Sequence, residues 1–271
     1  MKRHLIAIDL DGTTLNDESK LSVLTIQTLR RLNDLGHMVM IVTGRPYRNS
    51  KAIYRQIGID SPMVNFNGAL CHFPGNDHWL PYYHEELDRE IAFELFNHQD
   101  ELDISLLIAE GKEHLYTTSA QLPDSPFYPI DQLKISRLSR ESLTYNPTAL
   151  SIFCDDAKQE TIETELMKRY GDTISVRTWG GILPVLEVVR AGINKAVGVQ
   201  RVADFYHIPQ DCILAFGDEN NDYEMIQYAG LGVAMANATD EIKSIADTQT
   251  ERTNDEDGLA HFLLDYFDIT L

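Results

Sequence analysis

Two aspartates follow the first apolar segment of the chain, and their types and spacing suggest chemistry. Residues 4–9 read as a buried strand that ends in Asp9, and Asp11 follows two residues later, with Gly12 as a turn residue. An ionised carboxylate that is buried without a partner loses a large hydration free energy. We therefore expect a compensating positive charge beside this pair.

Further polar residues follow two other apolar segments, at residues 37–42 and 212–216. In open α/β sheets, ligands bind outside the carboxyl ends of the strands, so these residues should meet the aspartate pair. They are Thr43, Gly44, Asp218, Asn221 and Asp222. The combined set is rich in oxygen ligands and has no cysteine or histidine, which favours Mg²⁺ over Zn²⁺. A divalent ion would balance Asp9 and Asp218.

A metal ion alone leaves the second aspartate of the pair unexplained. If Asp9 binds the ion and attacks a phosphorus atom, a neighbouring carboxyl can protonate the leaving oxygen and later take a proton from water. Asp11 is spaced for that role. The hydroxyl of Thr43, the amide of Gly44 and the amine of Lys195 would supply donors and positive charge for the remaining phosphate oxygens.

Strand-like and helix-like segments alternate in the first and last parts of the chain, which predicts an α/β fold with a mostly parallel sheet. The expected strands lie at 4–9, 37–42, 63–66, 212–216 and 231–235. We expect one helix between Ser22 as N-cap and Gly36, with a buried stripe of Val23, Ile26, Leu29 and Leu32. The other expected helices run from Pro46 to Gly58, after Asp222, from 195 to 206 and from 255 to 267.

The middle of the chain has a more alternating pattern, which predicts a sheet with one solvated face. Its expected strands are 106–110, 113–118, 149–154 and 175–179, its helices are 85–98 and 157–170, and 124–140 is expected to be a long loop. We therefore predict a Rossmann-like parallel-sheet core with an inserted α+β cap domain. The core would comprise residues 1–81 and 189–271, and the cap residues 82–188.

Composition narrows the class of protein. The chain has 271 residues, with 43% apolar and 24% charged residues, as in an ordinary soluble globular protein. Its 42 acidic and 23 basic residues give a net charge of −19, which disfavours nucleic acid and anionic membranes as partners. The three cysteines are far apart, so neither a disulfide framework nor a zinc site is indicated. No apolar run is long enough for a signal peptide or a membrane span, so we expect a cytoplasmic protein.

Four segments resemble, in order, the signatures of the haloacid-dehalogenase-like phosphatase superfamily. They are Asp9-Leu10-Asp11-Gly12-Thr13, Thr43-Gly44-Arg45, Gly192-Ile193-Asn194-Lys195 and Gly217-Asp218-Glu219-Asn220-Asn221-Asp222. About 30 residues separate the first two signatures and about 145 separate the second from the third. This spacing resembles the Cof-type subfamily (subclass IIB), whose C2-type α/β cap lies between the second and third signatures. Asn67-Gly68-Ala69 also resembles that subfamily.

The resemblance implies a role for each matching residue. Asp9 would be the nucleophile that forms an aspartyl-phosphate, and Asp11 the general acid/base. Mg²⁺ would be held by the Asp9 carboxylate, the Asp11 backbone carbonyl and Asp218, with Asp222 supporting its water shell. The phosphate would be held by the Leu10 backbone, Thr43, Gly44, Lys195 and Asn221.

We therefore expect a Mg²⁺-dependent phosphatase that hydrolyses small phosphorylated metabolites, such as a sugar phosphate or a similar phosphomonoester. Two alternatives are a phosphomutase or phosphotransferase, and a non-catalytic regulator that binds a phosphorylated metabolite. The presence of Asp11 argues against the regulator, because a binding protein does not need an acid/base carboxyl. The substrate depends on residues 82–188, where no motif identifies a ligand.

Overall fold

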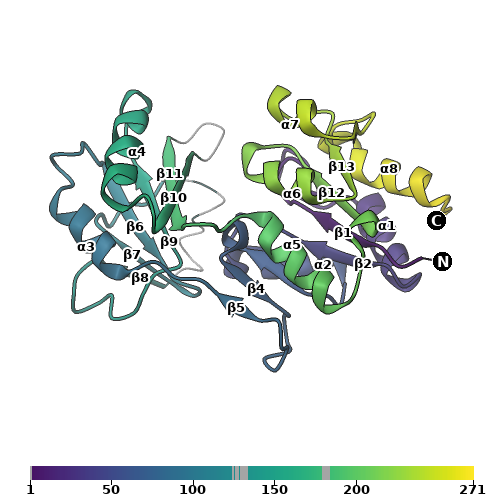
Figure 1. The fold of residues 1–271 in the computed structure, drawn as a ribbon, viewed down its shortest axis with the longest axis horizontal. Helices are drawn as coiled ribbons and strands as arrows, with labels where there is room; N and C mark the ends of the chain where they lie inside the picture. The colour runs from purple at the N-terminus through teal and green to yellow at the C-terminus, as the bar shows by residue number, and fades with distance from the viewer. Residues whose placement is uncertain (1, 124, 126–127, 129–133, 179–183) are drawn as a thin grey trace. The chain divides into compact units, whose positions relative to one another are not determined.

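The computed structural model describes residues 2–123, 125, 128, 134–178 and 184–271. The chain divides into two compact units, drawn in Figure 1. The first unit comprises Met1–Tyr83 and Asn194–Leu271, and the second comprises His84–Ile193. The expected junction near residue 188 falls inside strand β11 (Val185–Arg190), whose pairings among the described residues are with strands of the second unit, so β11 belongs to that unit as a whole. That the second unit acts as a substrate-selecting cap stays a prediction.

The first unit is built on a five-stranded sheet with the order β14-β13-β12-β1-β2. Every neighbouring pair in it is parallel. Its strands are β1 (Leu5–Ile8), β2 (Met38–Ile41), β12 (Ile213–Gly217), β13 (Leu231–Ala234) and β14 (Thr248–Gln249). Ile8 is aligned with Ile41 on one side and Phe216 on the other, so β12, β1 and β2 end at one level. The predicted parallel-sheet core is therefore confirmed.

Six α-helices belong to the described residues of the first unit. They are α1 (Val23–Asp34), α2 (Tyr47–Ile57), α5 (Lys195–Phe205), α6 (Tyr223–Tyr228), α7 (Asp240–Ile245) and α8 (Gly258–Phe267). Ser22 caps α1 as predicted, accepting a hydrogen bond from Thr25 N at 2.9 Å. The predicted buried stripe of α1 is partly wrong, because Val23 is 70% exposed. The buried face includes Thr25 and Thr28 instead, and the Thr25 hydroxyl donates to Asp257 beside α8.

The third expected strand is shorter than predicted and lies outside the main sheet. Strand β3 (Met63–Asn65) pairs antiparallel with β4 (Leu70–His72), and β5 (Tyr83–His84) completes a separate three-stranded sheet. A single parallel bridge joins Val42 to Val64, and Thr43 N donates to Val64 O at 3.0 Å. The chain leaves β3 at Phe66 because this residue and Asn67 both have positive φ. The end of β3 nevertheless stays beside the end of β2.

The second unit contains a six-stranded sheet with the order β10-β11-β9-β6-β7-β8. Besides β11, its strands are β6 (Leu106–Glu110), β7 (His114–Thr117), β8 (Lys134–Arg137), β9 (Ala149–Phe153) and β10 (Ile174–Thr178). Its helices are α3 (Arg89–Asn97) and α4 (Asp156–Tyr170). Part of the predicted loop 124–140 is thus strand β8. The rest of that loop at 124, 126–127 and 129–133, and the predicted strand end Trp179, lie outside the described residues.

The prediction of one solvated sheet face in the second unit is wrong for its central strands. Every residue of β6 and β9 is buried. One face packs on α3 and α4 through an apolar cluster that includes Ile91, Leu107 and Ile162. The opposite face carries a second apolar cluster, in which Ile108 and Phe153 pack with Tyr128 from the connecting segment. Because Tyr128 and Leu122 pack on the second face, both alternating sets of side chains of β6 and β9 are excluded from water.

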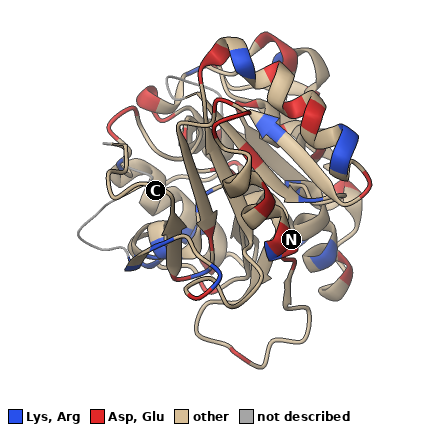
Figure 2. Cartoon of the chain, turned by 90° about the vertical axis from the view of Figure 1, so that its left-hand side faces the viewer, with Lys and Arg blue, Asp and Glu red and all other residues tan. Residues whose placement is uncertain are grey.

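Charge is spread widely over the described elements. Figure 2 shows acidic residues on many helices and loops, with lysine and arginine scattered among them rather than gathered into one block.

Among the helices of the described residues, none is long and apolar enough to cross a membrane.

Candidate active site

The first signature forms a tight turn at the end of β1. Asp9 N donates to Phe216 O at 3.1 Å, which extends the pairing of β1 with β12 by one residue. The carbonyl of Leu10 then accepts from Thr14 N at 3.0 Å, so the chain turns back at once. Gly12 has φ +71°, and a Cβ atom there would lie 2.1 Å from Asp218 Oδ2. Only glycine allows this close approach of the first and fourth signatures.

Three buried carboxylates gather where β1 and β12 end. Asp9, Asp218 and Asp222 each offer an oxygen, and these oxygens lie within 4.8 Å of one another. Burial raises the pKa of Asp9 to about 7, with the charge of Lys195 opposing the shift. Burial, followed by the charges of Asp9 and Asp222, raises the pKa of Asp218 to about 9. The cluster therefore resists full ionisation unless further positive charge is present.

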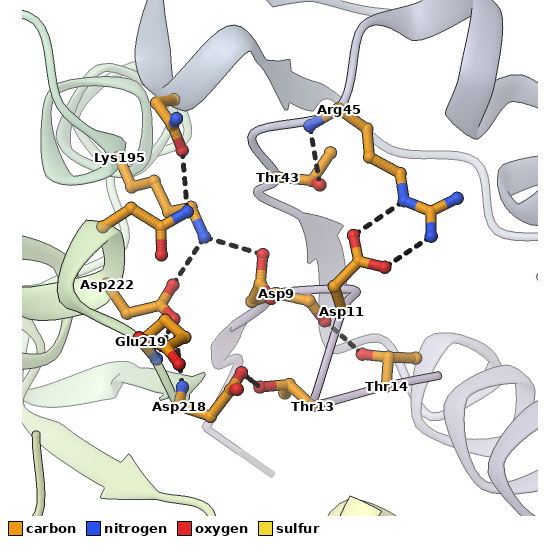
Figure 3. A network of polar contacts seen from close by, with 12 residues as sticks. Asp9, Asp11, Thr13, Thr14, Thr43, Arg45, Lys195, Asp218, Glu219 and Asp222 are labelled. Carbon is orange, nitrogen blue, oxygen red and sulfur yellow. Dashed lines mark hydrogen bonds and ion pairs between the residues drawn. The ribbon is translucent and has the colours of Figure 1, made fainter. Parts of the chain in front are cut away.

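Lys195 supplies part of that charge from the start of α5. Its side chain is fully buried, and Nζ donates to Asp9 Oδ1 at 2.7 Å and to Asp222 Oδ1 at 2.6 Å (Figure 3). Burial lowers the pKa of this ammonium, but the two carboxylates more than offset that effect and raise it. The Asn194 side chain accepts from Val197 N at 3.1 Å and so caps the helix that begins with Lys195.

The donor set fits a magnesium ion. Three ionised carboxylates beside one ammonium would leave the cluster with two negative charges, which one divalent cation would balance. All three ligand side chains offer hard oxygen atoms, the kind that Mg²⁺ prefers. Thr13 Oγ1 donates to Asp218 Oδ1 at 2.8 Å and fixes the orientation of that carboxylate. The charge of a Mg²⁺ ion here would oppose the effect of burial and lower the pKa values of Asp9 and Asp218.

Asp222 also organises the loop that carries Asp218. Its Oδ2 accepts from Asp218 N at 3.0 Å and from Glu219 N at 3.2 Å. The Glu219 side chain reciprocates by capping the backbone of Asp222, which completes a capping box. Gly217 permits this turn, since a Cβ there would lie 2.3 Å from Asp222 Cγ. Asp222 thus holds both the fourth signature and Lys195 in place.

Asp11 takes a different partner from the other aspartates. Arg45 Nε donates to Asp11 Oδ2 at 2.7 Å, and Arg45 Nη2 donates to Asp11 Oδ1 (Figure 3). The arginine side chain is buried, whereas 37% of the Asp11 side chain is exposed. From the sequence, Arg45 could either contact a substrate anion or pair with a neighbouring acid, and the acidic composition favoured the pair. The structure confirms a pair and shows that the acid is Asp11.

Asn67 connects the second signature to the fourth. Asn221 Nδ2 donates to Asn67 Oδ1 at 3.0 Å. The same oxygen would lie 3.0 Å from a Cβ atom at Gly44, so glycine lets the two loops approach. Asn67 is buried, and its backbone has a left-handed conformation with φ +51°. Asparagine tolerates this conformation better than most residues do. Sequence reasoning used Asn67 only as a mark of the subfamily, and its link to Asn221 was missed.

The structure therefore brings the predicted residues together in three groups. Asp9, Lys195, Asp218 and Asp222 are linked directly by short hydrogen bonds or close oxygen contacts. Asp11 joins the second signature through Arg45, whose backbone N donates to Thr43 Oγ1 at 3.1 Å. Gly44 and Asn221 meet at Asn67. The predicted role of the Leu10 backbone, like every catalytic and binding role, stays a prediction.

The family model for haloacid dehalogenase-like hydrolases matches residues 6–263, nearly the whole chain. The chain belongs to this family. The predicted superfamily is thus confirmed. A 5-amino-6-(5-phospho-D-ribitylamino)uracil phosphatase of Bacillus subtilis, YitU, is 39% identical over 270 residues, which are 99% of each chain. A putative phosphatase of Metamycoplasma hominis is 29% identical, over 97% of this chain and 96% of its own.

Solved structures agree with this assignment. A haloacid dehalogenase-like hydrolase from Bacteroides thetaiotaomicron has a TM-score of 0.85 and 26% identity, covering 98% of this chain and 100% of its own. A sugar phosphatase described as subclass IIB has a TM-score of 0.78 and 22% identity, covering 98% of this chain and 100% of its own. The fold of this hydrolase, with its inserted and mostly antiparallel sheet, is therefore similar to that of this subclass IIB enzyme.

Proposed function

We propose that this hydrolase is a Mg²⁺-dependent phosphomonoesterase that works through an aspartyl-phosphate on Asp9. The observation that carries the proposal is the buried cluster of three carboxylates around Lys195. The ammonium of Lys195 already binds Oδ1 of Asp9, and the remaining negative charge of the three carboxylates suits a divalent ion. The names of the relatives as phosphatases support the same reaction class.

The residues divide the reaction into two displacements. When bound, Mg²⁺ supplies positive charge that reduces the repulsion between the phosphate and the carboxylates. An Asp9 carboxylate oxygen attacks phosphorus, the bond from phosphorus to the leaving oxygen breaks, and Asp11 gives that oxygen a proton. Water then attacks the phosphorus of the aspartyl-phosphate while Asp11 takes its proton. Asp9 is thereby regenerated and inorganic phosphate leaves.

The remaining predicted residues would hold the phosphate during both steps. Lys195 lies within hydrogen-bond distance of the nucleophile, so its charge would also act on a phosphate oxygen held there. The hydroxyl of Thr43, the amides of Leu10 and Gly44 and the side chain of Asn221 supply further donors. Preorganised donors of this kind lower the free energy of the charged transition state more than that of the substrate.

For the substrate, we propose a small alkyl phosphomonoester, with 5-amino-6-(5-phospho-D-ribitylamino)uracil as the first compound to test. Three Bacillus subtilis relatives carry the name of a phosphatase for that compound, at 39%, 28% and 28% identity. The identity of 39% extends over both units of the chain, so it includes the part in which substrate-selecting residues are expected.

Phosphate release from a panel of sugar phosphates, nucleotides and this compound, with Mg²⁺ or with EDTA, tests the proposal. We expect release that requires Mg²⁺ and needs no sugar acceptor, which distinguishes a hydrolase from a phosphomutase. Asp9→Asn should abolish turnover, and Asp11→Asn should lower it about 10²–10⁴-fold, the usual contribution of acid–base catalysis, while Mg²⁺ binding persists. Undiminished release in EDTA, or by the Asp9→Asn variant, would contradict the proposed mechanism.

A further inference from the structure

Arg45 is a buried cation of the site to which the proposed mechanism gives no part. We propose that Arg45 is the positioning residue of Asp11. It holds the Asp11 carboxylate on the side of the second signature, apart from the carboxylates that would bind the metal, so that this side chain serves proton transfer. The inference rests on the proposed function, because it assigns Arg45 a purpose in the same reaction.

The contact between the two side chains fixes both oxygens of Asp11. Nε of Arg45 binds one carboxylate oxygen and Nη2 binds the other, in the parallel arrangement that a planar guanidinium favours. The Asp11 side chain is 37% exposed, so packing alone would leave it several rotamers. The Arg45 side chain is only 7% exposed, so packing holds its two N–H donors in place. These donors then restrict the more exposed Asp11 carboxylate to one orientation.

The backbone of Arg45 is itself held on both sides. Its N–H donates to Thr43 Oγ1 at 3.1 Å, and its carbonyl accepts from Asn65 Nδ2 at 2.8 Å. Asn65 is fully buried, and its Oδ1 lies 2.9 Å from His72 Nε2. The guanidinium thus extends from a backbone segment that β3 and β4 fix, and this rigidity is what a positioning residue requires.

Two cations divide the carboxylates of the site between them. Lys195 contacts Asp9 and Asp222, whereas Arg45 contacts Asp11. The oxygens that lie within 4.8 Å of one another belong to Asp9, Asp218 and Asp222, and not to Asp11 (Figure 3). Asp11 is only two residues from Asp9, so without Arg45 its carboxylate would turn toward a metal ion held by that group. Arg45 would therefore keep Asp11 out of the ligand set.

Leaving-group dependence separates this role from a general structural one. Arg45→Met should lower kcat/KM about 100-fold for the best alkyl phosphate of the panel, because its leaving oxygen needs a proton. For dinitrophenyl phosphate, whose leaving group departs without a proton, kcat/KM should stay nearly unchanged. Arg45→Lys should recover only part of the loss, since an ammonium cannot bind both carboxylate oxygens in parallel. Its recovery also guards against a folding defect in the methionine variant.

Two further measurements show whether Arg45 acts through Asp11. In an Asp11→Asn background, Arg45→Met should cause no additional loss of kcat/KM for the alkyl phosphate. By calorimetric titration, Arg45→Met should bind Mg²⁺ more tightly than the unaltered protein, and adding Asp11→Asn should cancel the gain. Arg140→Met is the control for the loss of an arginine–carboxylate pair, because Arg140 also forms two hydrogen bonds to one carboxylate, that of Glu90 at 2.9 and 2.7 Å, on the exposed surface of the second unit. It should change neither quantity.

The outcomes are distinct. An equal loss for both substrates, or an additional loss in the Asp11→Asn background, would overturn the inference and indicate that Arg45 contacts the phosphoryl group itself. Unchanged kinetics and unchanged Mg²⁺ affinity would overturn it as well. If the unaltered protein hydrolyses neither substrate, the proposed function fails, and the Mg²⁺ titrations alone decide whether Arg45 restrains Asp11.

Discussion

Replacing Asp218 by asparagine should stabilise the metal-free protein while it removes metal-dependent activity. Burial and the neighbouring charges of Asp9 and Asp222 raise the pKa of Asp218 to about 9 in the folded state. The unfolded chain has the ordinary value of 3.8, so folding at neutral pH must take up a proton or bury a charge. Asparagine has the shape of the protonated carboxyl and still accepts the hydrogen bond from Thr13. It avoids that cost.

The size of the effect follows from the difference between the two pKa values. At pH 7 the protonation of a group with an unfolded pKa of 3.8 costs about 4 kcal/mol, at about 1.4 kcal/mol per unit. The penalty is absent at pH values below 3.8, grows as the pH rises, and levels off above about 9. Since 1 kcal/mol shifts Tm by about 2–4 °C for a domain of this size, Asp218→Asn should raise Tm on the order of 10 °C at pH 7.

The assay is thermal unfolding of both proteins in EDTA between pH 4 and pH 9, followed by a repeat in Mg²⁺. The advantage of the variant should shrink toward pH 4, and Mg²⁺ should stabilise only the unaltered protein. Asp222→Asn is the control with the opposite sign, because it removes a carboxylate that pairs with Lys195 at 2.6 Å. If Asp218→Asn melts at or below the temperature of the unaltered protein in EDTA at pH 7, the electrostatic reasoning is wrong.

Three further changes test the same cluster. Gly12→Ala should lower the free energy of unfolding by about 2–5 kcal/mol and weaken Mg²⁺ binding, because alanine is strained at positive φ and its Cβ would lie 2.1 Å from Asp218 Oδ2. An unchanged midpoint of urea unfolding would contradict this. Lys195→Met should lower the free energy of unfolding by about 3–5 kcal/mol, since it leaves the buried carboxylates of Asp9 and Asp222 without the ammonium that pairs with them. Urea unfolding followed by circular dichroism measures this free energy. Mg²⁺ affinity should rise with pH up to about 9, because the pKa values of Asp9 and Asp218 are about 7 and about 9 and Mg²⁺ binding must release their protons. Calorimetric titration at several pH values measures the affinity, and a comparison of two buffers at one pH measures the protons released. An affinity that does not change with pH would refute the prediction.

Elements with strong local signals were predictable from the sequence. The first helix begins at a serine cap and the second ends at Gly58, whose φ of 75° suits a left-handed cap. Helix α7 (Asp240–Ile245) and strand β4 (Leu70–His72) were not predicted. Such elements of six and three residues carry too little periodicity, and tertiary contacts decide their conformation.

The boundary of the second unit could not be read accurately for a related reason. Residues 185–189 are apolar except for Glu187, which resembles the pattern of a parallel strand covered on both faces. The same pattern arises in β11, which pairs antiparallel with both of its neighbours, because α3 and α4 cover one face of that sheet and apolar side chains that include Tyr128 pack on the other. The apolar composition of a segment indicates that the strand is buried, but it does not indicate to which sheet the strand belongs.

For the site, the sequence predicted which residue types gather but not how they pair. The three carboxylates and Lys195 follow from strand ends that must meet at one edge of a parallel sheet. The contact between Arg45 and Asp11 joins positions 34 residues apart, and it depends on side-chain directions that no spacing encodes. The link between Asn67 and Asn221 depends likewise on a left-handed residue after β3.

The order of the central sheet also determines when the site can form during synthesis. Strand β1 leaves the ribosome early, and β2 can pair with it soon afterwards, but its other neighbour β12 begins only at Ile213. The second unit is continuous from His84 to Ile193, so its strands are complete before that neighbour exists. Until β12 emerges, the apolar edge of β1 is unpaired and is a site for aggregation or chaperone binding. Asp9, which directly follows β1, therefore meets Lys195 and the other two carboxylates of the cluster only after the last third of the chain has been made.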